Sequence, residues 1–113
     1  MTYIPIVLSA AFLLFCAGIA YCLKNYYPKE PNPWVGYRTR RSLKSNDSWT
    51  LANAYAGKLL FRYSIAEICL FPLVVVIAGP PAQFVFLITA CLWTMALFTT
   101  IFQTERMLKK SGY

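Results

Sequence analysis

Few side chains in this sequence could do chemistry, and the one that stands out is a carboxyl group beside a long apolar run. Glu67 directly precedes residues 68–104, which carry no charged side chain. An ionised carboxylate inside a bilayer costs about 2.5 kcal/mol or more, so Glu67 should be protonated, paired or hydrated. Arg62 is an imperfect partner at five residues' distance, whereas Tyr63, at four, could donate a hydrogen bond. Glu67 is therefore either a structural hydrogen-bonding residue or a site for a ligand or a proton.

The remaining reactive groups form no recognisable catalytic or metal site. The sequence has no His, no Gly-rich phosphate loop and no nucleophile beside a base. Glu67 and the guanidinium of Arg38 lack the second catalytic group or metal cage that most mechanisms need. We therefore expect a protein that is not an enzyme, needs no cofactor or metal and binds no nucleic acid. The four cysteines lie in apolar runs without metal-ligand spacing, which indicates small buried residues: Cys16, Cys22, Cys69 and Cys91.

Three apolar segments must position these residues. Apolar residues make up 58% of the 113-residue chain, more than a soluble domain of this size can bury. Residues 4–23 carry no charge, and Gly79, Pro80 and Pro81 divide the second apolar run into two helices. A cleaved signal peptide is the alternative for residues 4–23, but such a peptide has its basic region before the apolar run, whereas the first Lys of this chain, Lys24, follows the run. The sequence thus predicts an all-α membrane protein, one domain over 1–113, with spans at about 4–23, 59–78 and 82–103.

The distribution of Lys and Arg predicts the orientation of these spans. The turn between the second and third spans has no basic residue, whereas the first connection and the C-terminal tail have many. Basic residues beside a span favour the cytoplasm. We therefore expect the N-terminus outside, and the C-terminus and the structured segment 24–58 in the cytoplasm. The basic residues are Lys24, Lys29, Arg38, Arg40, Arg41, Lys44 and Lys58 in the connection, and Arg106, Lys109 and Lys110 in the tail.

The first connection has features of a structured segment that leads into a long helix. Trp34 and Tyr37 are suited to the headgroup layer, where a ring is buried while its polar atom stays wet. The side chains of residues 46–48 could cap a helix that begins near Trp49. From there to residue 78 the helix would measure roughly 45 Å, which exceeds the hydrocarbon thickness. One face of this helix is polar and small: Trp49, Asn53, Gly57, Leu60, Ser64 and Glu67.

An ordered set of residues around this connection resembles the signature of the SdpI family of small bacterial membrane proteins. The resemblance implies a multi-pass protein of the bacterial cytoplasmic (inner) membrane. The member that gives the family its name is an immunity protein, which protects toxin-producing cells from a secreted membrane-active peptide and takes part in signalling. The resemblance gives no chemical role to the matching residues, which are Asn32, Gly36, Tyr37, Arg38, Thr39, Trp49, Asn53 and Gly57.

The motif also has a physical interpretation. Gly36 permits a turn that a residue with a Cβ would resist, and Arg38 can bond carbonyl oxygens or lipid phosphate. We expect residues 32–39 to fold back against the second helix, with Arg38 close to Asn53 and Gly57. The neighbouring Arg40, Arg41 and Lys44 set the orientation and attract anionic headgroups.

Three functions are compatible with these features. The first is an immunity or envelope-stress protein that recognises a peptide toxin or its damage, and the second is an accessory or assembly subunit of a larger membrane complex. The third, an enzyme or transporter using Glu67 and Arg38, is the weakest, because three helices enclose no pathway. The expected partners are a bilayer with anionic headgroups, a peptide toxin, and further copies or subunits.

Overall fold

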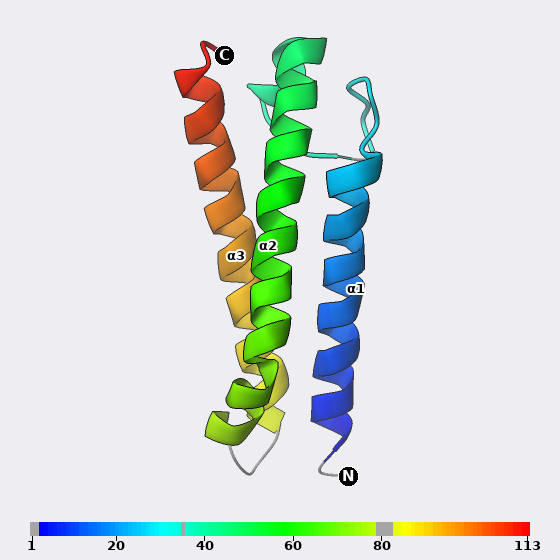
Figure 1. Ribbon diagram of the computed structural model, residues 1–113, viewed down its shortest axis with the longest axis vertical. Helices are drawn as coiled ribbons and strands as arrows, with labels where there is room; N and C mark the ends of the chain where they lie inside the picture. The colour runs from blue at the N-terminus through cyan, green and yellow to red at the C-terminus, as the bar shows by residue number, and fades with distance from the viewer. Residues whose placement is uncertain (1–2, 35, 79–82) are drawn as a thin grey trace.

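A computed structural model describes residues 3–34, 36–78 and 83–113, and every regular element in these ranges is helical (Figure 1). The long helices are α1 (Ile4–Tyr26), α2 (Asn46–Ala78) and α3 (Gln83–Lys110), and a short 3₁₀ helix, η1 (Ser42–Lys44), precedes α2. All three long helices are long and apolar enough to cross a membrane, which confirms the all-α, three-span prediction. The predicted turn at residues 79–81 lies outside the described residues.

The three long helices lie side by side in an elongated bundle of 50 × 23 × 19 Å (Figure 1). α2 packs against both α1 and α3, which also contact each other. The N-terminus lies at one end of the bundle, and the C-terminus lies at the opposite end with the α1–α2 loop, residues 27–45 (Figure 1). We call this second end the basic end, because the Lys and Arg side chains of the loop and of the α3 terminus gather there.

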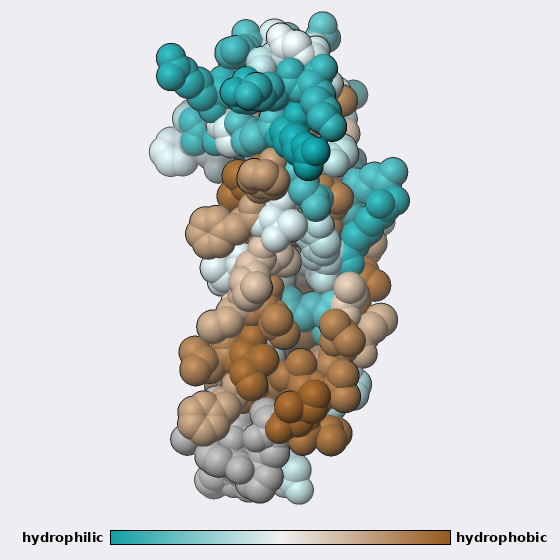
Figure 2. Space-filling model, turned by 90° about the vertical axis from the view of Figure 1, so that its left-hand side faces the viewer, coloured by the Kyte–Doolittle hydropathy of each residue, from teal (hydrophilic) through white to brown (hydrophobic). Residues whose placement is uncertain are grey.

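The surface of the bundle divides into a polar cap and an apolar body. In Figure 2 the hydrophilic residues cover the basic end, whereas hydrophobic residues cover much of the rest of that face. Large apolar side chains point outward along all three helices; for example, Phe15 is 69% exposed, Val76 77% and Phe98 66%. Such a surface is unfavourable in water and suits contact with lipid.

The helices are longer than predicted at the basic end. α2 begins at Asn46, three residues before the expected Trp49, because Ser45 caps it. The Ser48 N–H donates to Ser45 Oγ at 3.1 Å, and the Ser45 N–H donates to Ser48 Oγ at 3.0 Å. This reciprocal pair resembles a capping box. α3 continues to Lys110, seven residues beyond the predicted end of its span, and this extension brings Glu105 into a helix.

The polar and small face predicted for the second helix is the face that α2 buries. All six of its residues, from Trp49 to Glu67, are buried. Two side-chain hydrogen bonds join this region to α3: Trp93 Nε1 donates to Ser64 Oγ at 3.3 Å, and the Tyr63 hydroxyl donates to Gln103 Oε1 at 3.0 Å. The bundle is therefore held by hydroxyl and amide contacts as well as by packing.

Candidate functional site

The first part of the candidate site joins the α1–α2 loop to α2 through main-chain atoms of Tyr37. The Tyr37 N–H donates to Asn53 Oδ1 at 2.6 Å, and Asn53 Nδ2 donates to the Tyr37 carbonyl at 3.4 Å and the Trp49 carbonyl at 2.9 Å. Asn53 is fully buried, so these bonds satisfy groups that water cannot reach. One amide thus fixes both main-chain polar groups of Tyr37, much as a neighbouring strand would.

Gly36 makes this approach possible. Its φ is +111°, which L-residues rarely adopt. A Cβ at this position would lie 2.8 Å from Asn53 Oδ1 and 2.9 Å from the ring of Trp49. Both neighbours are fully buried, so neither can easily move away. At Gly36 and Tyr37 the loop therefore lies directly against Asn53 and Trp49 of α2.

Trp49 and Gly57 hold neighbouring segments at the same end of the bundle. Trp49 Nε1 donates to the Pro28 carbonyl at 2.6 Å, which fixes the start of the loop. A Cβ at Gly57 would lie 2.7 Å from the main-chain N and Cα of Lys24. The prediction that Gly57 leaves room for another backbone is therefore correct, but that backbone belongs to the end of α1 and not to residues 32–39.

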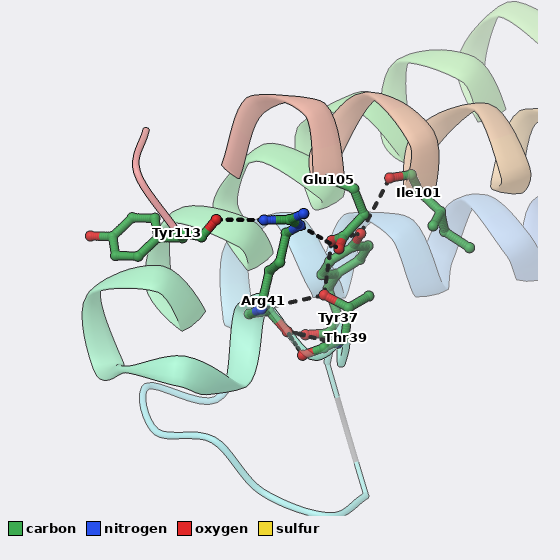
Figure 3. Close-up of polar contacts among 7 residues, drawn as sticks. Tyr37, Thr39, Arg41, Ile101, Glu105 and Tyr113 are labelled. Carbon is green, nitrogen blue, oxygen red and sulfur yellow. Dashed lines mark hydrogen bonds and ion pairs between the residues drawn. The ribbon is translucent and has the colours of Figure 1, made fainter. Parts of the chain in front are cut away.

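The second part of the site joins the loop to α3 through Glu105 (Figure 3). The Tyr37 hydroxyl donates to Glu105 Oε2 at 2.7 Å and also lies 3.3 Å from the Ile101 carbonyl. The Thr39 hydroxyl donates to the same Oε2 at 2.8 Å. Two hydroxyl groups from one short segment thus converge on one carboxylate oxygen, and such bonds to an ionised acceptor are stronger than neutral ones.

Arg41 lies at the outer side of the same carboxylate (Figure 3). Its Nε is 3.8 Å from Glu105 Oε1, and its Nη1 donates to the main-chain carbonyl of Tyr113 at 2.6 Å. Because both charged side chains are about one-third exposed, this ion pair contributes little to stability. Its effect is to connect the loop with the end of the chain beyond α3.

The turn between Thr39 and η1 is fixed by Ser42, which is fully buried. Its hydroxyl lies 2.7 Å from the Thr39 N–H, from which it accepts, and 3.1 Å from the Tyr37 carbonyl. The loop is therefore bonded within itself as well as to α2 and α3. We call the cluster of Gly36, Tyr37, Thr39, Ser42, Asn53 and Glu105 the loop anchor.

Tyr37 does not lie where the sequence suggested. Its exposed fraction is 8%, so the prediction that it sits in the headgroup layer is wrong, whereas Trp34 is 87% exposed. Burial, followed by the hydrogen bond with Glu105, raises the pKa of the Tyr37 hydroxyl above its usual value. Tyr37 therefore keeps its proton at physiological pH and acts as a donor.

Two motif residues, Arg38 and Asn32, are not members of the loop anchor. Arg38 is exposed, and no hydrogen bond or ion pair joins its guanidinium to the described residues, so its predicted place near Asn53 is taken by the main chain of Tyr37. Arg38 instead lines a hollow beside Gly36 and Leu60. Asn32 makes a local turn in which its Oδ1 accepts from the Trp34 N–H at 2.9 Å.

Glu67 lies apart from the loop anchor, fourteen residues or roughly 21 Å along α2 from Asn53. Its side chain is 7% exposed and therefore lies inside the bundle. The predicted hydrogen bond is not found among the described residues: both carboxyl oxygens are without a partner. Tyr63, the expected donor, binds Gln103 instead.

The sequence interpretation missed Glu105 and Ser42, which provide bonds that close the loop anchor. One signal could have indicated Glu105: it is the lone acidic residue of a basic tail, directly after an apolar run. A carboxylate at the end of a span, across from a loop rich in hydroxyl and basic groups, is a natural acceptor.

Comparison with known proteins identifies the family. A sequence model of the SdpI/YfhL protein family matches residues 29–102, a range that includes all eight motif residues. A protein of Bacillus subtilis (strain 168), named uncharacterized protein YfhL, is 34% identical over 106 residues, which cover 86% of this chain and 80% of that protein. No solved structure matches the chain. The family match and the similarity to YfhL agree with the residues of the motif, and the chain therefore belongs to the SdpI/YfhL family.

Proposed function

We propose that this chain is an SdpI-like immunity protein of the bacterial cytoplasmic membrane, which protects its cell from a membrane-active peptide toxin or senses the damage that such a peptide causes. The proposal assigns it no catalytic step, since the described side chains of the loop anchor are engaged in structural bonds. The family resemblance supplies the class of function, and one surface feature next to the motif supplies a place for the peptide.

That feature is an apolar groove of about 540 Å³ along the outer face of α1. Gly36 lines the groove together with α1 residues such as Phe15, Gly18 and Cys22, and Tyr27 lies at the start of the loop. The groove therefore joins the family motif to a surface that suits lipid. A peptide that inserts into membranes has the apolar side chains that such a groove would accept. This junction is the observation that carries the proposal.

The orientation and the lipid contacts form part of the same proposal. The distribution of basic residues supports an external N-terminus and a cytoplasmic basic end. Arg40, Arg41 and Lys44 line a hollow of about 330 Å³ beside Glu105, which suits an anionic headgroup. Under this arrangement the groove begins at the cytoplasmic headgroup layer and extends into the bilayer.

A survival assay tests the proposal with a matched pair of variants. Expression of the chain should let a sensitive bacterium survive a membrane-active peptide toxin. Gly18 lines the groove, and a Cβ there would meet no atom within 4 Å, so Gly18→Phe introduces a ring at this position to block the groove. Val7, 63% exposed on the same helix, does not line the groove, and Val7→Phe is the control. Gly18→Phe should remove protection, and Val7→Phe should retain it.

Two outcomes would count against the proposal. If the wild-type chain gives no protection against any such peptide, the immunity function fails. If Gly18→Phe protects as well as the wild type, the groove is not the binding place. Stable copurification of other membrane subunits, combined with absent protection, would support the alternative of an accessory or assembly subunit.

A further inference from the structure

The interior of the bundle contains a carboxyl group for which the described residues provide no partner. Glu67 is only 7% exposed, and no described residue forms a hydrogen bond with its Oε1 or Oε2. The Thr89 hydroxyl on α3 is also buried and has no hydrogen-bond partner in the part of the chain that the structure describes. Buried polar atoms are nearly always satisfied, so unpartnered ones that gather in one region indicate a bound species.

Antiparallel packing places these groups at the same level of the bundle. The hydrogen bond between Ser64 of α2 and Trp93 of α3 fixes which parts of the two helices face each other. Glu67 is three residues after Ser64, and the corresponding step in the opposite direction along α3 leads from Trp93 to the region of Thr89. Glu67 is eleven residues, or roughly 16 Å, from the end of α2 at Ala78, and this is near the middle of a hydrocarbon layer about 30 Å thick.

No described cation can neutralise an ionised Glu67. On α2, Arg62 is exposed and lies about 140° around the helix axis from Glu67, and the Tyr63 hydroxyl is bonded to Gln103. On α1, Lys24 lies at the level of Gly57 of α2. Glu67 is ten residues further along α2, and the corresponding step back along α1 leads to the buried Leu13 and Cys16. Cys16 is thus the titratable group that α1 offers. On α3, the titratable group near this level is Cys91, which is exposed.

We infer that Glu67 is a proton-binding site inside the membrane, with the proton held on the carboxyl group at neutral pH. A carboxylate without a cation or a donor is unstable at this depth, whereas the acid form removes the charge. The bound ligand is a proton, and the site does not depend on the immunity function proposed above.

Infrared spectroscopy tests this inference, because a neutral carboxylic acid has a carbonyl stretch that a carboxylate lacks. The glutamates of the chain are Glu30, Glu67 and Glu105. In the Glu30→Gln/Glu105→Gln double variant, Glu67 is the sole glutamate. Labelling this variant with ¹³C-carboxyl glutamate therefore shifts the carbonyl stretch of Glu67 and of no other side chain. The protein would be held in a maltoside detergent, which has no ester carbonyl to obscure the band.

At pH 7 the double variant should show a neutral carboxyl band that moves on ¹³C labelling. The Glu67→Gln variant should lack the band completely, and Glu105→Gln alone should retain it. The absence of an isotope-sensitive neutral band at pH 7, with a carboxylate band in its place, would overturn the inference. This assignment uses the native Glu67 side chain, so it holds even where Glu67→Gln fails to fold.

Discussion

The glycines of this chain provide a graded test of the loop anchor. Gly36 combines a φ of +111° with two neighbours closer than 3.0 Å to a Cβ. Gly112 has a φ of +93° and no neighbour within 4 Å, and Gly18 has neither feature. Alanine at the three positions therefore separates backbone strain from steric clash. Left-handed backbone costs a residue with a Cβ about 1–2 kcal/mol, and overpacking costs about 1–3 kcal/mol more.

Gly36→Ala should accordingly weaken loop docking by at least about 2 kcal/mol. If the loop opens without global unfolding, that amount makes the open form roughly 30-fold more populated, since 1.4 kcal/mol is about tenfold. Trypsin cleaves after Arg38, Arg40 or Arg41 when the loop is open, and the cleavage rate measures this population. The protein would be digested in mild detergent, with helix content followed by circular dichroism to confirm that the bundle is intact.

The controls make the result decisive. Gly18→Ala should be cleaved at the wild-type rate, and Gly112→Ala should change cleavage at the loop little, because its strain lies beyond α3. If Gly36→Ala were cleaved no faster than Gly18→Ala, the close approach of Gly36 to Asn53 and Trp49 would not hold the loop, and the reasoning would be refuted.

Three further predictions concern the same end of the molecule. Folding raises the pKa of Tyr37, so above about pH 10 the unfolded chain releases the Tyr37 proton while the folded chain keeps it. Stability should therefore fall as the pH rises beyond 10, and thermal scans should show a smaller fall for Tyr37→Phe than for the wild type. Asn53→Ala leaves the buried Tyr37 N–H without its acceptor and should cost about 1–3 kcal/mol in unfolding titrations, whereas the exposed Asn46→Ala should cost far less; equal losses would contradict the role of Asn53. In a variant without native cysteines, Tyr3→Cys should react with an impermeant thiol reagent outside the cell and Arg40→Cys should not; the reverse pattern would invert the proposed orientation.

The helices and the inward face of α2 could be predicted from the sequence for a simple reason. Charge-free runs of about 20 residues define spans, and helical spacing alone puts Trp49, Asn53 and Gly57 on one face. Gly36 could also be assigned to a close turn, because glycine has no Cβ and so permits a turn that other residues resist. These features are local, and each follows from one segment of the chain.

The pairings between segments could not be predicted in the same way. Tyr37 and Glu105 are 68 residues apart, and their contact depends on the rotation of α3 and on its continuation past the apolar run. Tyr37 is buried and Arg38 is exposed, and the sequence contains no signal for which of these two neighbours faces the bundle. For Glu67, burial followed from position, but its hydrogen bonding depended on which donors the neighbouring helices presented.

The contact between Tyr37 and Glu105 is the central claim about how the motif works, and a double-mutant cycle measures it directly. Unfolding free energies would be determined in detergent for the wild type, Tyr37→Phe, Glu105→Gln and the double variant. A hydrogen bond of 2.7 Å to a carboxylate predicts single losses of about 1.5–3 kcal/mol and a coupling energy of about 1 kcal/mol or more. Losses that add to within about 0.3–0.5 kcal/mol would show that the two side chains do not interact, and would contradict the docking of the loop on α3.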